Sequence, residues 1–150
     1  MKVYILSQRE AEYYSKKLPP DNRTAIISIT TKEDCDPPAD IQNAKFIMRM
    51  QFNDIEADFY DVKNGFFYAP TQEDFAGLKD YIDFVNKYGE ELWIHCAAGV
   101  SRSAGLAAAV CEYLGYSHDI FDCGRYVPNR LVYKLAKKEL GIYEWSEYDV

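Results

Sequence analysis

Short apolar runs alternate with amphipathic segments along most of the chain. Four runs predict buried strands, because they are short, apolar and bounded by turn-forming residues; they span residues 2–6, 25–29, 45–52 and 92–95. Segments with helical spacing of apolar residues follow them, at 8–18, from 71 to Gly89, at 103–114 and from about 130 to 141. Strands that alternate with helices predict an α/β fold, a three-layer sandwich with a central, mainly parallel sheet of about four or five strands flanked by helices.

The segment from Thr71 to Gly89 has the clearest helical pattern. Thr71 and Asp74 have the spacing of a capping box, which satisfies backbone N–H groups in the first turn of a helix. The apolar residues that follow form one stripe at helical spacing: Phe75, Leu78, Ile82 and Val85. We therefore expect one helix that packs this stripe against the core and ends at Gly89.

Two long segments lack such patterns and predict loops, at residues 31–43 and 53–70. The second is acidic and crowded with aromatic residues: Phe59, Tyr60, Phe66, Phe67 and Tyr68. These rings could form a wall that clamps a substrate ring. The interpretation that the pattern favours is a small core that holds a long loop against the domain.

Composition and charge restrict the function. With 150 residues, of which 48% are hydrophobic, the chain fits one domain over residues 1–150. The net charge of −7 disfavours nucleic acid as a partner, because polyanions are repelled. No apolar run approaches the roughly 20 residues that span a bilayer, and the N-terminus does not have the pattern of a signal peptide. We expect a cytoplasmic protein without a membrane partner.

The cysteines and histidines do not have the spacing of a metal site. There is no C-x-x-C pair, and His95 and His118 lie 23 residues apart. Disulfides are not expected in a reducing compartment, which favours plain thiols at Cys35, Cys111 and Cys123. The sequence therefore predicts no metal and no other cofactor.

One segment carries recognisable chemistry, and it joins the strand at 92–95 to the helix at 103–114: His95-Cys96-Ala97-Ala98-Gly99-Val100-Ser101-Arg102-Ser103. A loop at a helix N-terminus points unpaired backbone N–H groups at one spot and adds the positive end of the helix dipole. Such a spot binds inorganic phosphate or a similar oxyanion. The residues expected to surround the phosphate are Ala97, Ala98, Gly99, Val100, Ser101 and Arg102.

Within this loop, Cys96 is the candidate nucleophile. The same positive field should lower the pKa of its thiol from about 8.5 into the range of roughly 3.5–7.5. A thiolate aimed at a bound phosphorus atom predicts a phosphocysteine intermediate, and the planar fork of Arg102 can hold two phosphate oxygens. His95 is expected to fix the loop by hydrogen bonding, and Ser103 to donate to the thiolate when it leaves.

The pattern H-C-x-x-G-x-x-R-S resembles the signature of the cysteine-dependent protein tyrosine phosphatases, and the short chain is most similar to the dual-specificity and small bacterial or viral-type members. The resemblance implies a dual-specificity-phosphatase-like fold and metal-independent hydrolysis of phosphomonoesters. Rhodanese-like loops have fewer residues between Cys and Arg than the five found here. Low-molecular-weight tyrosine phosphatases place the loop near the N-terminus, with the acid after it.

The general acid is expected in the acidic segment upstream of Cys96. Asp54 is favoured because Phe52-Asn53-Asp54-Ile55 resembles the F-x-D-I element of small bacterial family members. Asp58 and Asp61 lie in the same segment and are the alternatives.

The substrate class follows less directly. Neutral residues in the loop favour a phosphorylated protein or peptide, since relatives that act on phosphoinositides tend to carry lysines there. The alternatives are a nucleotide or RNA 5′-phosphate phosphatase, and a pseudophosphatase that binds phosphoproteins without hydrolysing them. Arg125 and the turn Pro128-Asn129-Arg130 could lie near the phosphate, as the corresponding turn does in relatives, or Asn129 could simply cap a helix.

Overall fold

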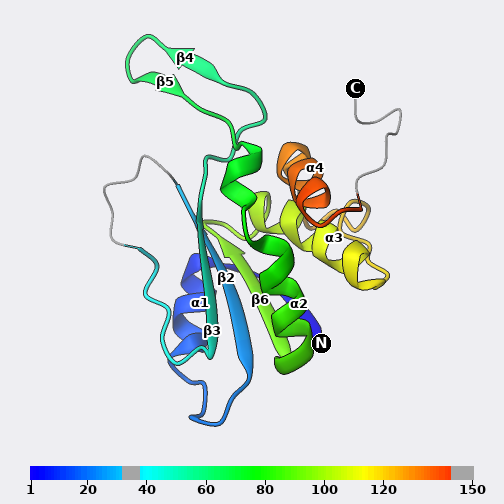
Figure 1. The fold of residues 1–150 in the computed structure, drawn as a ribbon. Coiled ribbons are helices and arrows are strands. Elements are labelled where there is room, and N and C mark those ends of the chain that lie inside the picture. The colour runs from blue at the N-terminus through cyan, green and yellow to red at the C-terminus, as the bar shows by residue number, and fades with distance from the viewer. Residues whose placement is uncertain (32–37, 143–150) are drawn as a thin grey trace.

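The computed structural model describes residues 1–31 and 38–142 (Figure 1). Cys35 and the middle of the predicted 31–43 loop lie outside these residues. The described parts contain six strands, four α-helices and one short 3-10 helix.

Four parallel strands form the central sheet. They are β1 (Lys2–Ser7), β2 (Thr24–Thr30), β3 (Phe46–Gln51) and β6 (Glu91–Cys96), in the order β1-β6-β2-β3. All three pairings are parallel. The two inner strands, β6 and β2, are almost wholly buried, as their continuous apolar runs predict for strands covered on both faces.

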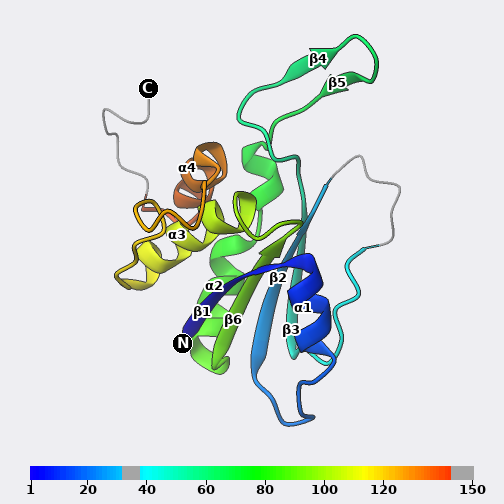
Figure 2. The ribbon, with the colours of Figure 1, turned by 180° about the vertical axis from the view of Figure 1, so that it is seen from behind.

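Helices cover both faces of this sheet (Figures 1 and 2). The helix α1 (Gln8–Ser15) packs on one face, over a small core that includes Ala11, Ile26 and Trp93. The larger core lies on the other face, beneath α2 (Leu78–Tyr88), α3 (Arg102–Leu114) and α4 (Arg130–Glu139). The predicted three-layer α/β sandwich with a central parallel sheet is therefore confirmed.

The predicted single helix from Thr71 is wrong in one respect, because the structure divides it in two. A 3-10 helix, η1 (Gln72–Phe75), comes first, and α2 starts after Gly77. Gly77 has a φ of +84°, a left-handed conformation that interrupts helical hydrogen bonding. Asp74 accepts a hydrogen bond from the Thr71 N–H at 2.8 Å, as expected for its half of a capping box. The apolar stripe is buried on both sides of the break.

The predicted 53–70 loop contains a β-hairpin that the sequence analysis missed. Strands β4 (Phe59–Asp61) and β5 (Gly65–Phe67) pair antiparallel and form no pairing with the central sheet. Asp61 shapes the turn by accepting hydrogen bonds from the Lys63 N–H and the Asn64 amide, and Gly65 takes a φ of +90°. An Asn-Gly dipeptide is a known hairpin signal.

This hairpin projects from the body of the domain, beyond the end of the sheet where β6 runs into α3 (Figures 1 and 2). The favoured prediction of a small core holding the segment against the domain is therefore wrong. Most of its aromatic rings are exposed, and they pack across the hairpin on one another. None of the helices in residues 1–31 and 38–142 is both long and apolar enough to cross a membrane.

Candidate active site

The loop predicted to bind phosphate, residues 97–102, lies at the carboxyl end of the sheet, where β6 leads into α3. Gly99 takes a φ of +72°, and a Cβ on it would lie 2.6 Å from the backbone of Leu6 and Ser7, where β1 ends. The Gln8 N–H donates to the Ala97 carbonyl at 3.2 Å. The loop is thus pressed against β1 at a distance that only glycine permits.

The Cys96 thiol lies at the base of this loop. Its Sγ is 3.1 Å from the Ser103 Oγ and receives the Gly99 N–H at 3.3 Å. Burial alone would raise the pKa of Cys96, but hydrogen bonds from Ser103 and Gly99, together with the Arg102 charge, hold the pKa below its usual value. The geometry therefore favours a thiolate, with Ser103 as a hydrogen-bond donor to it.

The Arg102 side chain is buried, and only part of its guanidinium is hydrogen-bonded. Nη1 donates to the Phe52 carbonyl at 3.0 Å and to the Thr31 hydroxyl at 3.2 Å. Its Nε is the one buried side-chain nitrogen or oxygen without a partner among the described residues. A buried unsatisfied donor costs free energy unless a ligand satisfies it, and a phosphate oxygen has the charge and acceptor capacity to do so.

His95 is buried beneath the loop and supports it in the neutral form. Burial lowers the pKa of the imidazole below its usual value. Its Nδ1 lies 3.2 Å from the Cys96 carbonyl, which can only accept, so Nδ1 carries the proton. Nε2 then accepts from the Ser28 hydroxyl at 2.6 Å. His95 thus links the residue before the loop to the neighbouring strand β2.

Of the three candidate acids, the structure brings one to the loop. Asp54 Oδ1 accepts from the Ser101 hydroxyl at 2.7 Å, and its side chain is exposed. Asp58 instead accepts the Ala69 N–H at the base of the hairpin, and Asp61 lies in the hairpin turn. Ala97 and Ala98 are exposed, so this part of the loop is open to solvent.

The sequence left open whether Asn129 caps a helix or lies near the phosphate loop, and in the structure it does both. Its Oδ1 accepts from the Val132 N–H at 3.0 Å and caps α4, while its Nδ2 donates to Asp54 Oδ1 at 3.0 Å. Its backbone N–H also donates to the Ser101 carbonyl. In the sequence, the only signal for this role of Asn129 is the Pro128-Asn129 pair at the start of a predicted helix. Arg125, for which the sequence left a place near the phosphate open, lines a cavity of about 590 Å³ beside β1.

In the described parts of the chain, the remaining thiols and carboxylates do not form a metal site. Within residues 1–31 and 38–142 there is no group of three or more His, Cys, Asp or Glu side chains that could hold a metal ion. Cys111 and Cys123 are free thiols, and burial raises the pKa of Cys111 to about 11.

Comparisons with known proteins agree with this geometry. The family described as the catalytic domain of dual specificity phosphatases matches residues 3–116. The solved structure of Tk-PTP in its active form is similar, with a TM-score of 0.57 at 15% identity over 94% of this chain and 92% of that chain. The human tyrosine phosphatase-like serine/threonine/tyrosine-interacting protein is also similar, with a TM-score of 0.58 at 18% identity over 93% of this chain and 91% of that chain. A search of the curated proteins finds no matching sequence.

Proposed function

Because the chain belongs to the dual specificity phosphatase family and is a hydrolase of the protein tyrosine phosphatase type, we propose that it dephosphorylates proteins or peptides through a phosphocysteine intermediate on Cys96. The observation that carries this proposal is one loop that holds both a hydrogen-bonded thiol of lowered pKa, Cys96, and the buried, unpartnered Nε of Arg102.

In the first step, the Cys96 thiolate attacks phosphorus and forms an S–P bond. The ester P–O bond breaks, and the leaving oxygen takes a proton from the Asp54 carboxyl group. Charge on the equatorial oxygens is stabilised by the Arg102 guanidinium and the N–H groups of the loop. The hydrogen bond from Ser101 supports this role for Asp54, because it places the carboxyl group at the rim of the loop.

In the second step, water attacks phosphorus, and Asp54, now a carboxylate, accepts its proton. The S–P bond breaks, inorganic phosphate leaves, and the electron pair returns to Cys96 as a thiolate. Ser103 supports this step as a donor at 3.1 Å from Sγ, because it stabilises the thiolate as a leaving group. The Arg102 guanidinium and the loop N–H groups supply the positive charge for both steps, so we propose no metal or organic cofactor.

The proposed substrate class rests on the charge of the loop and of the whole chain. Ala97, Ala98 and Val100 add no positive charge around the phosphate, and the chain has a net charge of −7. Both features disfavour substrates with several phosphates, such as nucleic acids and phosphoinositides. A single phosphate on a polypeptide fits this site better.

Hydrolysis of p-nitrophenyl phosphate in EDTA tests the mechanism, with vanadate as the inhibitor and Cys96→Ser as the inactive variant. We expect metal-independent turnover that vanadate abolishes and the variant lacks. Phosphate or vanadate binding without turnover would instead indicate a pseudophosphatase. Turnover that survives in Cys96→Ser would refute the phosphocysteine intermediate, and a panel of phosphopeptides and nucleotides would then test the substrate class.

A further inference from the structure

The β4–β5 hairpin has exposed aromatic residues that the catalytic steps do not use. Tyr60 and Phe66 lie directly opposite each other on the two strands, with ring centroids 4.9 Å apart. Tyr68 stacks on Phe66 at 6.2 Å and continues the same face. We call these three residues the aromatic face; their exposed fractions are 59%, 63% and 57%.

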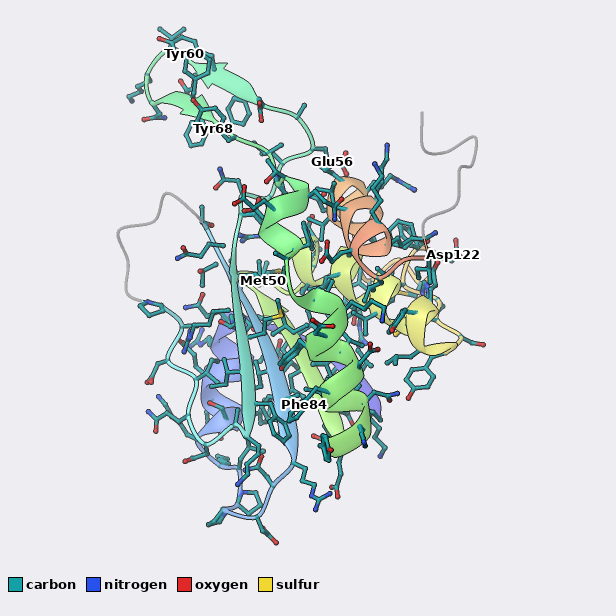
Figure 3. All side chains as sticks on the ribbon, viewed as in Figure 1. Met50, Glu56, Tyr60, Tyr68, Phe84 and Asp122 are labelled. Carbon is teal, nitrogen blue, oxygen red and sulfur yellow. The ribbon has the colours of Figure 1, made fainter. Side chains whose placement is uncertain are left out.

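This face lies outside both hydrophobic cores. Exposed apolar patches mark interaction sites, and a lone two-stranded hairpin is only marginally stable in water. The hairpin pairs with no strand of the central sheet. Figure 3 shows Tyr60 and Tyr68 on the projecting hairpin, away from the cores that hold the rest of the chain together.

The base of the hairpin is tied to the phosphate loop. The buried Asn53 amide donates to the Tyr68 carbonyl at 3.0 Å, and Asp54 follows Asn53 in the chain. Glu56 accepts the Arg130 N–H at 2.6 Å, which fixes the segment before β4 to the start of α4. Figure 3 shows Glu56 beside α4 at this base. The base of the hairpin is thus held beside the phosphate loop.

Charge decides which partner fits this face. Residues 54–68 contain four carboxylates and one lysine, on a chain with a net charge of −7. The turn hydrogen bonds from Lys63 and Asn64 lower the pKa of Asp61, so that carboxylate stays ionised. An anionic bilayer or a nucleic acid would be repelled, whereas a basic polypeptide segment would be attracted.

We propose that the β4–β5 hairpin is a docking arm for the polypeptide substrate, and that its aromatic face binds an apolar side chain flanked by basic residues. This inference rests on the proposed function, because it assigns the substrate segment that lies outside the phosphate loop. Tyr60 is six residues beyond Asp54, so at about 3.3 Å per extended residue the face lies within about 20 Å of the acid. About six extended residues therefore suffice to reach from the phosphorylated residue to the aromatic face.

The test compares phosphotyrosine peptides of two lengths. The long peptides carry a Leu flanked by lysines, eight residues to either side of the phosphotyrosine, and the short peptide ends before that segment. We expect KM to be about tenfold lower for one of the long peptides, with kcat unchanged, since docking adds binding away from the reacting bond. Replacing the lysines by glutamates should abolish the gain.

The variant Tyr60→Ser/Phe66→Ser should remove this gain and leave p-nitrophenyl phosphate turnover unchanged. Tyr13→Ser/Tyr14→Ser is a matched control, because those rings also pair, at 5.2 Å, and are 54% and 48% exposed on α1. The control should retain the gain. Equal KM values for short and long peptides in an active enzyme would overturn the docking arm and leave the proposed function intact.

Binding to Cys96→Ser, measured by fluorescence polarisation of labelled peptides, separates docking from catalysis. Tighter binding of the long peptide by this protein, with no turnover by the active enzyme, would refute the proposed function and retain the docking arm. Two results would show that the aromatic face binds another partner and would overturn the docking arm. In one, the protein sediments with phosphatidylcholine–phosphatidylserine vesicles; in the other, it self-associates in sedimentation velocity. In either case the variant Tyr60→Ser/Phe66→Ser would have to lose the interaction.

Discussion

Substitution of Gly99 by alanine tests how strictly the phosphate loop depends on its contact with β1. The added Cβ would lie 2.6 Å from the Leu6 carbonyl carbon and the Ser7 nitrogen, whereas ordinary contacts begin at 3.4 Å. Both atoms belong to the backbone and cannot rotate away. The loop therefore has to move by about 0.8 Å, and a displacement of about 1 Å at a catalytic site can cost about 100-fold in rate.

The conformational cost of alanine can be separated from this contact. Alanine in a left-handed conformation costs about 1–2 kcal/mol relative to its usual region. Gly115 ends α3 with a φ of +77°, and a Cβ there would meet nothing within 4 Å. Gly115→Ala therefore has the conformational cost alone, whereas Gly99→Ala has that cost together with the displacement of the loop.

The assay combines urea unfolding with steady-state hydrolysis of p-nitrophenyl phosphate and inhibition by vanadate. For Gly115→Ala we expect the free energy of unfolding to fall by about 1–2 kcal/mol, with kcat/KM unchanged. For Gly99→Ala we expect a larger loss of stability, at least about 100-fold lower kcat/KM and weaker vanadate inhibition. If both variants lost the same stability and kept full activity, the loop would not depend on its approach to β1.

Further substitutions test three roles proposed around the loop. Asp54→Asn should lower kcat on an alkyl phosphate about 100-fold or more, because a poor leaving group needs the proton, while Asp58→Asn should stay near wild type; the opposite ranking would assign the acid to Asp58. Ser103→Ala removes a donor to the thiolate, so it should raise the apparent pKa of Cys96 and enlarge the presteady-state burst relative to turnover; an unchanged ratio would exclude this role. Asn129→Ala should lower the free energy of unfolding by about 1 kcal/mol and also reduce kcat on the alkyl phosphate. Asn129→Asp should restore the helix cap but not the rate. Full activity in both variants would show that Asn129 only caps α4.

The sheet and the position of the loop could be predicted because their signals are local. The apolar runs of β2 and β6 are continuous, as buried parallel strands require. Gly77, which separates η1 from α2, could not be recognised as a break in the same way, because the apolar stripe continues across it. Helical periodicity reports which side chains face the core, and a short left-handed break leaves that pattern intact.

The hairpin and the contacts of Asn129 depend on information that single segments lack. The run from Phe59 to Phe67 is aromatic on both faces of the hairpin, so it lacks the alternation that identifies a strand with one buried face. Asn64-Gly65 is the one local hairpin signal in this segment. Asn129 donates to Asp54, which lies 75 positions away in the sequence, and only the packing of α4 beside the segment that carries Asp54 brings the two together.

The ionisation of Cys96 at neutral pH is the claim on which the proposed chemistry depends. Its most direct measurement is the ultraviolet absorbance of the thiolate as a function of pH, with Cys96→Ser subtracted to isolate this sulfur. Hydrogen bonds and the Arg102 charge lower the pKa of Cys96, so the thiolate signal should persist as the pH falls below the usual thiol value of about 8.5. A midpoint above pH 7, which would leave the sulfur mostly protonated at neutral pH, would contradict the account.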